Sequence, residues 1–253
     1  MTSWWRLVLF GCLPLGSEAA QAQSGEDVIR MMHQRYSGGW FHTVMFAQDN
    51  THYAGDSTWH SRWDHAFQLP GKLRIDNYPL EQGNGVIIAN DTTYVFQGGK
   101  LTSTVTRPLS LMLIAFDAYV IPPEKTISDL RALGFDLGVV HEEPWQGRPA
   151  YVVGAHAGDL HARQFWIDRE NLLAVRVIEP LAQDSTKARD VRFNKYERIG
   201  QGWIAPEVMM YQGGKPLRLE AYQWMRKDVP VDPRLFDPAQ FNATRGFLKD
   251  REE

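Results

Sequence analysis

Three histidines lie close together in the sequence and are the first candidates for metal binding or catalysis. His52, His60 and His65 alternate with Asp56 and Asp64, and imidazole and carboxylate groups are common ligands of Zn²⁺. If this stretch is a strand, however, His60 and His65 point to opposite faces and could share an ion only across a bulge. The sequence has no His-Glu-x-x-His motif and no cysteine pair. We predict no metal site, and keep a His-dependent metalloenzyme as an alternative.

Motifs for covalent catalysis and for phosphate binding are missing from the sequence. There is no Gly-x-Ser-x-Gly elbow, and glycine pairs such as Gly98-Gly99 fall at predicted hairpin turns rather than before a helix. Glu142 and Glu143 are adjacent in a predicted strand, so their carboxylates face opposite sides. The formal net charge is -3, without a basic stripe for nucleic acid. We expect no catalytic residues, no cofactor and no nucleic-acid partner, so the protein is interpreted as a non-enzyme.

The most informative pattern is an alternation of aromatic and polar residues before the turn signal Pro70-Gly71. Side chains alternate between the two faces of a strand, so this stretch predicts a hairpin with one apolar face and one polar face. The apolar face would carry Trp59, Trp63, Phe67, Leu73 and Ile75. That face covers either a packed core or an apolar cavity, and the two remain equally compatible with the pattern.

Helical patterns occur at the start and in the middle of the sequence. Ser24 is a predicted N-cap for an amphipathic helix over Glu26–Ser37. The segment Pro108–Asp117 is apolar nearly all round, which is typical of a helix that is buried or docked over an apolar opening. Glu124–Leu133 predicts another helix, with Gly134 as its C-terminal stop.

The remaining sequence is dominated by short strand-like runs separated by turns. The first run, Trp40–Gln48, ends before a predicted polar loop over Asp49–Gly55. We expect about ten to eleven strands in all, and short turns join antiparallel neighbours. A sheet of that size must curl or close. The fold is therefore predicted to be mainly β (α+β): a strongly curved antiparallel sheet with helices covering its concave face.

The first 22 residues have the features of an export signal. Arg6 precedes a short apolar run, and Ala20-Gln21-Ala22 fits the small-x-small cleavage pattern. We expect cleavage after Ala22, leaving residues 23–253 as a single domain in the periplasm. Cys12 is the only cysteine and lies in a sequence that weakly resembles a lipoprotein-processing box, so lipid anchoring through Cys12 is the alternative.

In order and spacing, several motifs resemble those of the LolA/LolB-like superfamily of bacterial outer-membrane lipoprotein-sorting and periplasmic lipid-binding proteins. The matching segments are Phe46-Ala47-Gln48, Trp63 with Pro70-Gly71-Lys72-Leu73-Arg74-Ile75-Asp76, Asn90-Asp91-Thr92-Thr93-Tyr94-Val95-Phe96, Phe165-Trp166-Ile167-Asp168-Arg169-Glu170-Asn171-Leu172-Leu173 and Leu235-Phe236-Asp237-Pro238. Together they extend over most of residues 26–240. One position departs from the pattern: the carriers place a basic residue directly before the hairpin proline, and this chain has Leu69.

The resemblance implies an unclosed β-barrel whose apolar cavity binds an acyl chain, a lipid or a lipoprotein, in outer-membrane lipoprotein sorting or envelope lipid handling. It implies a monomer that meets lipoprotein machinery of the outer or inner membrane. An envelope sensor or scaffold that binds a protein partner is the alternative. The expected cavity lining is Trp59, Trp63, Phe67, Leu73, Ile75, Tyr94, Phe96, Phe165 and Ile167, with Leu111, Ile114 and Phe116 as a lid.

Overall fold

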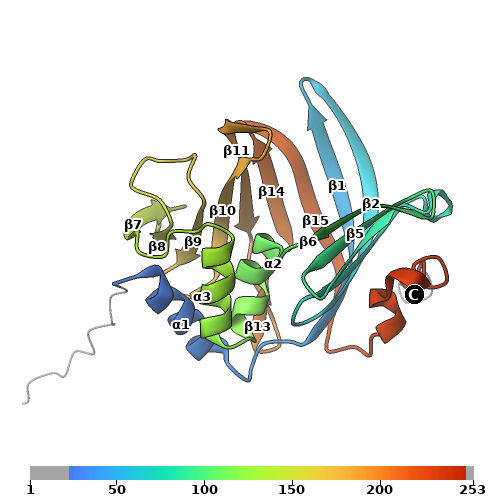
Figure 1. Cartoon of the computed structure of the whole chain (residues 1–253), viewed down its shortest axis with the longest axis horizontal. Helices are drawn as coiled ribbons and strands as arrows, with labels where there is room; N and C mark the ends of the chain where they lie inside the picture. The colour runs from blue at the N-terminus through green and yellow to red at the C-terminus, as the bar shows by residue number, and fades with distance from the viewer. Residues whose placement is uncertain (1–22, 249–253) are drawn as a thin grey trace, which may run out of the picture.

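A computed structural model describes residues 23–248 of the chain (Figure 1). The predicted signal peptide, Cys12 within it, and the tail 249–253 lie outside the described residues. No helix within residues 23–248 is long and apolar enough to cross a membrane.

Most of the described chain folds into strands that form two arms, consecutive in sequence. The first arm contains β1 (Thr43–Ala54), β2 (Ser57–Gln68), β3 (Lys72–Asn77), β4 (Gly85–Ala89), β5 (Thr92–Gln97) and β6 (Lys100–Thr106). The second arm contains β7 (Val140–Trp145), β8 (Arg148–Val153), β9 (Gln164–Asp168), β10 (Ala174–Leu181), β11 (Asp184–Asn194), β14 (Glu207–Gln212) and β15 (Lys215–Lys227). Between β11 and β14, β12 (Glu197–Ile199) and β13 (Gly202–Ile204) pair in a sheet of their own.

The two arms join into one antiparallel sheet of thirteen strands, in the order β6-β5-β4-β3-β2-β1-β15-β14-β11-β10-β9-β8-β7. Within each arm, neighbours in sequence are mostly neighbours in space, because tight turns link them. At the β4–β5 turn, Asn90 and Asp91 have φ of 51° and 57°, the left-handed backbone that a two-residue hairpin favours. The arms meet where β1 pairs with β15. The sheet is open, with β6 and β7 as its edges.

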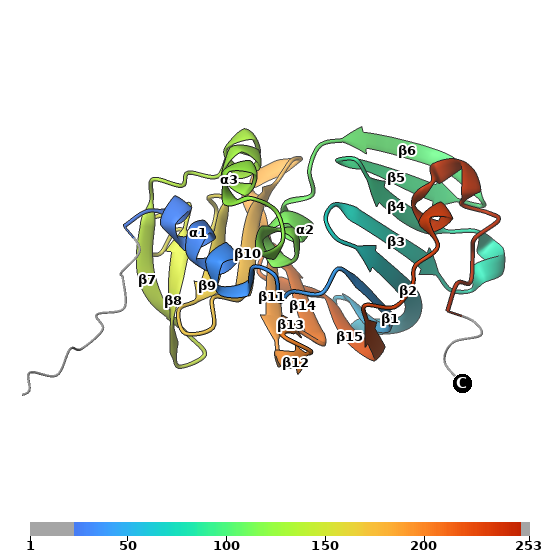
Figure 2. The ribbon, with the colours of Figure 1, turned by 90° about the horizontal axis from the view of Figure 1, so that it is seen from below.

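Three α-helices cover one face of the sheet, which we call the inner face. They are α1 (Gly25–Tyr36), α2 (Ser110–Ala115) and α3 (Pro123–Ala132), and Figure 2 shows the sheet bent around them. The predicted cap is confirmed, since the Ser24 side chain accepts a hydrogen bond from the Asp27 N–H. Gly134 follows α3 with a φ of 86°, as expected for a helix stop. The apolar segment around α2 is short: after Ala115 the chain continues into the 3₁₀ turn η2 (Asp117–Tyr119).

The outer face of the first arm is covered by the C-terminal segment, residues 231–248. This segment includes η3 (Pro233–Phe236) and η4 (Pro238–Gln240), and an isolated 3₁₀ turn, η1 (Leu80–Gln82), lies between β3 and β4. Phe241 stacks on Phe96 with ring centroids 3.8 Å apart. The buried Arg74 guanidinium donates to the Phe241 carbonyl at 3.0 Å and to Asp76 at 2.6 Å. The C-terminal segment therefore covers the outer face of this part of the sheet.

Two sequence-based expectations need correction. β1 continues to Ala54 instead of ending at Gln48, because residues 49–54 pair with β2 on one side and residues 49–52 extend the pairing with β15 on the other. The strands also outnumber the expected ten to eleven. The strand-like sequence over 189–199 is interrupted at Lys195, whose φ is 58°. The strand-like sequence over 203–211 is interrupted before β14, so each of these stretches forms two strands.

Candidate functional site

The inner face is largely apolar and contains most of the predicted lining residues. The residues packed there include Phe67, Leu73, Ile75, Leu111, Ile114, Phe116, Phe165 and Ile167. The β1–β2 and β2–β3 registers place Trp59 and Trp63 on the same face. The hairpin face identified from the alternation is therefore brought together with the α2 side chains.

Tyr94 and Phe96 are not part of this surface. The register pairs Thr93 with Ile88, and Ile88 belongs to the inner-face core, so Tyr94 and Phe96 point to the outer face. There they pack with the C-terminal segment. β5 has apolar residues on both faces, with Tyr94 and Phe96 on one and Val95 on the other. Its pattern therefore does not indicate which face is the inner one.

One half of the inner face, which we call the lower half, is filled by α2 and its flanking residues. The Phe116 ring stacks on Phe67 with centroids 4.7 Å apart. Trp40 stacks on Tyr119 at 4.0 Å, and the Tyr119 hydroxyl accepts the Ala174 N–H at 3.0 Å. Close aromatic packing of this kind behaves as a core.

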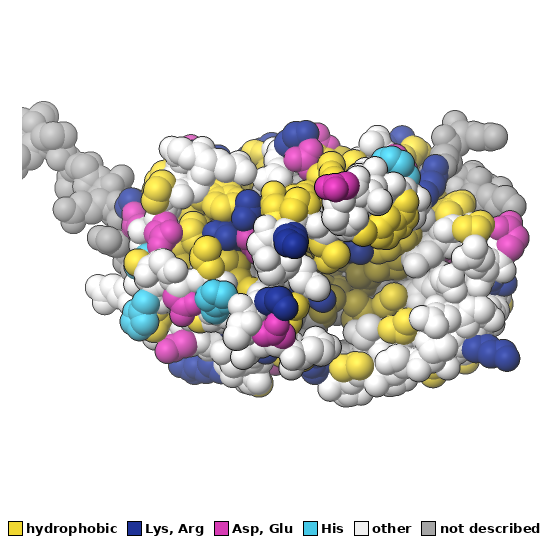
Figure 3. Space-filling model, turned by 90° about the horizontal axis from the view of Figure 1, so that it is seen from above, with side chains coloured by type: hydrophobic (Ala, Val, Ile, Leu, Met, Phe, Trp, Pro, Cys, Tyr) yellow, Lys and Arg dark blue, Asp and Glu magenta, His cyan; other side chains and the backbone are white. Residues whose placement is uncertain are grey.

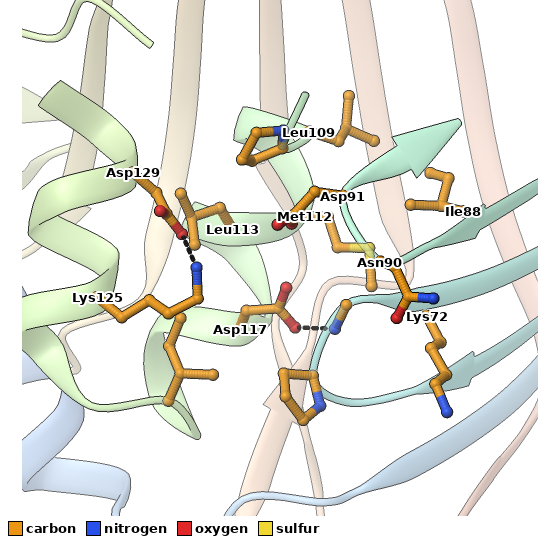
Figure 4. A pocket seen from close by; sticks show the side chains of 14 residues that line it. Lys72, Ile88, Asn90, Asp91, Leu109, Met112, Leu113, Asp117, Lys125 and Asp129 are labelled. Carbon is orange, nitrogen blue, oxygen red and sulfur yellow. Dashed lines mark hydrogen bonds and ion pairs between the residues drawn. The ribbon is translucent and has the colours of Figure 1, made fainter. Parts of the chain in front are cut away.

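A small side pocket lies between α2, α3 and two hairpin turns of the first arm (Figure 4). Its volume is about 190 Å³. The Asp117 carboxylate accepts the Gly71 N–H at 3.1 Å, so it fastens the β2–β3 turn to the segment after α2. Burial raises the pKa of Asp117 to about 6, against the Gly71 hydrogen bond, which lowers it. Lys125 is paired with Asp129 at 2.8 Å and leaves Asp117 without a direct cationic partner in this view.

The upper half of the inner face is open. An upper pocket of about 220 Å³ lies between the start of α2 and the strands β10, β11, β14 and β15. It is lined by Leu109, Leu111, Val177, Glu179, Arg189, Val191, Met210, Leu217 and Arg218. A third cavity, below Phe116, measures only about 10 Å³. All three border α2 or the residue before it, so the helix separates cavities that are each below the ~300 Å³ of a usual small-molecule site.

Exposed hydrophobic side chains surround this open half. Trp59 on β2 is 50% exposed, Val105 on β6 46% and Leu109 before α2 40%. The register β2-β3-β4-β5-β6 places Val105 on the inner face with Phe67. Figure 3 looks onto a hollow with hydrophobic side chains gathered in and around it.

Beside the upper pocket, the middle of the sheet carries a buried polar cluster. Arg218 donates to the Glu220 carboxylate at 2.6 and 2.9 Å and lies over the Trp63 ring at 4.4 Å. The Tyr222 hydroxyl donates to the other Glu220 oxygen at 3.3 Å. Burial raises the pKa of Glu220, against the opposing charge of Arg218. The Gln48 amide donates to Asn50 at 2.6 Å.

His65 lies among aromatic rings within this region. It stacks on Phe46 with centroids 4.8 Å apart, and burial lowers its pKa to about 3, so the imidazole is neutral. Neither of its ring nitrogens has a hydrogen-bond partner among residues 23–248.

The three histidines do not converge. His52 bonds Ser61 and stacks on Trp59 on the inner face, while the register places His60 on the opposite face of β2. Within residues 23–248 no three His, Cys, Asp or Glu side chains gather in a geometry that could hold a metal ion.

Sequence reasoning missed the polar residues of the site: Gln48, Asn50, Glu179, Arg189, Arg218 and Glu220. The signal was present, because Arg218, Glu220 and Tyr222 alternate along one strand, as do Gln48, Asn50 and His52 along another. We had interpreted part of the second series as a loop.

A cavity of about 340 Å³, larger than the three that border α2, lies on the outer face over β10 and β11. Two guanidinium groups line this cavity, those of Arg176 and Arg192, and both donate to Asp190, at 2.7 and 2.8 Å. Arg176 also lies over Trp166 and Trp145 at 4.9 and 5.3 Å. Both guanidinium groups are therefore already held by hydrogen bonds to one carboxylate, whereas the Arg189 side chain of the upper pocket has no such bond within the described chain.

Comparison with solved structures shows that the fold is similar to those of three proteins described as lipoprotein-sorting, LolA superfamily or DUF1329 family proteins. A putative outer membrane lipoprotein-sorting protein domain from Vibrio parahaemolyticus superposes with a TM-score of 0.58 at 11% identity, covering 86% of this chain and 98% of that one. A DUF1329 family protein from Desulfovibrio piger gives 0.57 at 14% identity, with 86% and 97% covered. A LolA superfamily protein from Nitrosomonas europaea gives 0.53 at 13% identity, with 85% and 98% covered.

Sequence comparison adds no further relatives. No protein-family model matches the chain. No curated protein matches it either. At identities this low the similarity concerns the fold, and the predicted resemblance to lipoprotein-sorting proteins is confirmed at that level.

Proposed function

We propose that this protein is an exported, periplasmic lipid-binding protein whose open sheet is an unclosed barrel around α2. It binds an acyl chain, free or carried by a lipid or lipoprotein, on the upper half of the inner face, and has no catalytic role. The observation that carries the proposal is that Trp59, Val105 and Leu109 are exposed, and that Leu109 lines a pocket with an apolar floor. Soluble domains seldom leave grouped apolar side chains in water without a binding purpose.

The position of α2 supports a mechanism for making room. The helix has only six residues, and Ser110 at its start is fixed to β10 through a 2.7 Å hydrogen bond to Glu179. At its other end, Asp117 is held by the β2–β3 turn. A shift of this short segment would join the upper pocket to the side pocket. The joined cavity would reach the volume that ligand sites usually have.

The test is to purify the mature protein, extract it with organic solvent and analyse the extract by mass spectrometry. The stripped protein is then titrated with a fluorescent fatty acid. We expect co-purified lipid or saturable uptake, and uptake reduced in the Leu109→Asp variant, which places a charge at the edge of the pocket. Arg234→Gln, which alters the outer surface, is the control. Absence of both lipid and uptake would contradict the proposal.

A second candidate function is that of an envelope sensor or scaffold with a protein partner. The edge strand β6 favours it, because all seven of its residues are exposed and its outer side has no paired strand within the described chain. An extended peptide could add to such an edge. Co-purification of a stoichiometric protein in place of lipid would support this alternative.

A further inference from the structure

One cation at the upper pocket lacks a partner. Arg189 lines the pocket from β11, directly across the ladder from Glu179 on β10. That register would normally favour an ion pair between the two side chains. Within residues 23–248, however, the side chain of Arg189 forms no hydrogen bond or ion pair, although its backbone pairs with β10 and β14.

Glu179 does not pair with Arg189, and each of its carboxylate oxygens accepts a hydrogen bond from another side chain. The Ser110 hydroxyl donates to one oxygen at 2.7 Å, and Arg163 donates to the other at 2.7 Å. These contacts hold the carboxylate toward α2 and β9. Glu179, the cross-strand neighbour of Arg189, thus holds the start of α2 in place.

The second arginine of the pocket is in a different state. Arg218 bonds to Glu220, lies over Trp63 and donates to the Met210 sulfur at 3.2 Å. It is therefore anchored in the polar cluster. The charged residues that line the pocket are Arg189, Arg218 and Glu179. Just outside it lie Arg163, which bonds to Glu179, and Glu220, which bonds to Arg218. Three guanidinium groups thus face two carboxylates, and the uncompensated positive charge is that of Arg189.

The floor below Arg189 is apolar. Val177 and Val191 lie in the buried core, and Leu111 and Met210 pack against it. A guanidinium beside an apolar floor suits a molecule with a hydrocarbon part and an anionic end, since arginine binds carboxylates and phosphates through two parallel hydrogen bonds.

We propose that the upper pocket selects amphiphiles with an anionic head group, and that Arg189 binds the head while the acyl chain lies on Val177, Val191, Leu111 and Met210. This inference rests on the proposed function and narrows its ligand class. Neutral acyl chains would use the same floor but leave Arg189 unpaired. The carboxylate of a fatty acid and the phosphate of a lysophospholipid share the required chemistry.

The test compares three probes with the same twelve-carbon chain: dodecanoate, dodecyl phosphate and 1-dodecanol. Each is titrated calorimetrically into lipid-stripped protein, below the concentration at which it forms micelles or separates. We expect both anions to bind about tenfold more tightly than the alcohol, as one charge-assisted contact would give. A higher affinity for dodecanoate or for dodecyl phosphate would distinguish a fatty acid from a phospholipid-derived ligand.

Arg189→Gln is the decisive variant, and Arg234→Gln is its control. Arg189 is exposed and forms no contact that folding needs, so an unchanged melting temperature is expected. Arg189→Gln should abolish the preference for anions while dodecanol binding stays the same. Arg234→Gln removes the same charge from the outer surface and should keep the preference.

The outcomes separate the two proposals. Equal binding of the three probes, or an unchanged preference in Arg189→Gln, would overturn the role of Arg189 and leave acyl-chain binding intact. Failure of all three probes to bind would overturn the proposed function itself.

Discussion

The two halves of the inner face are built on the same strands but differ in what covers them. In the lower half, α2 and the turn after it fill the space, and rings such as Phe67 and Phe116 stack closely. In the upper half, Trp59 and Leu109 face solvent and Arg189 has no partner within the described residues. The difference teaches that an aromatic strand face is not evidence of a cavity by itself. One strand, β2, contributes to a core at one end and to an exposed surface with Trp59 at the other.

The largest effect should come from opening the filled half. Phe67→Ala removes a buried ring that packs on both Phe46 and Phe116. We expect the free energy of unfolding to fall by about 3–5 kcal/mol, measured by urea denaturation. A loss below about 1 kcal/mol would show that the lower half is not close-packed and would remove the contrast between the halves.

The next effect concerns the hydrogen bond between Asp117, after α2, and Gly71 in the β2–β3 turn. The pKa of Asp117 is about 6 in the folded protein, above its unfolded value near 3.8. The folded state therefore binds more protons, so this contribution is fully present below about pH 4 and is lost as the pH rises through 6. Relative to Asp117→Asn, the wild type should lose about 2–3 kcal/mol of stability between pH 4 and pH 7. Parallel pH profiles for the two proteins would contradict this.

A smaller effect of opposite sign is expected at His65. Its buried ring nitrogens lack partners, and buried polar groups without hydrogen bonds are costly. His65→Phe keeps the stacking on Phe46 and should raise the free energy of unfolding by about 1 kcal/mol. A destabilised variant that also loses ligand binding would instead show that the imidazole serves the site.

The smallest effect on stability is expected in the open half. Leu109→Ser changes a side chain that is 40% exposed, so the unfolding free energy should stay within about 0.5 kcal/mol of the wild type. Fluorescent fatty-acid binding should nevertheless weaken several-fold. Equal binding by this variant and the wild type would place the ligand elsewhere and remove the functional half of the comparison.

Much of the fold could be predicted because the local signals agreed with the final structure. The capped first helix, the Pro70-Gly71 turn and the aromatic face of β2 all follow from residue chemistry and period. The two-residue turns also fixed the antiparallel order within each arm. These features depend on neighbours in sequence.

The site was harder to predict because it depends on pairing between distant strands. β1 was cut short at Gln48, since a polar run is a strand only when partners on both sides pair with it. Tyr94 and Phe96 were placed in the cavity because nothing local indicates that the C-terminal segment covers the other face. The isolation of Arg189 depends on the hydrogen bonds that occupy Glu179, and no spacing rule reports those.

The joint between the two arms has a consequence for how the chain folds. Each arm is a series of hairpins that can form from nearby residues, but β1 and β15 come from opposite ends of the described chain. The Thr43 hydroxyl donates to the Val229 carbonyl across 186 residues. Closing so long a loop costs more chain entropy than closing a hairpin, and distant pairings slow folding. The arms should therefore form first and the β1–β15 ladder last, so the polar cluster of Gln48 and Glu220 would be assembled in the final step.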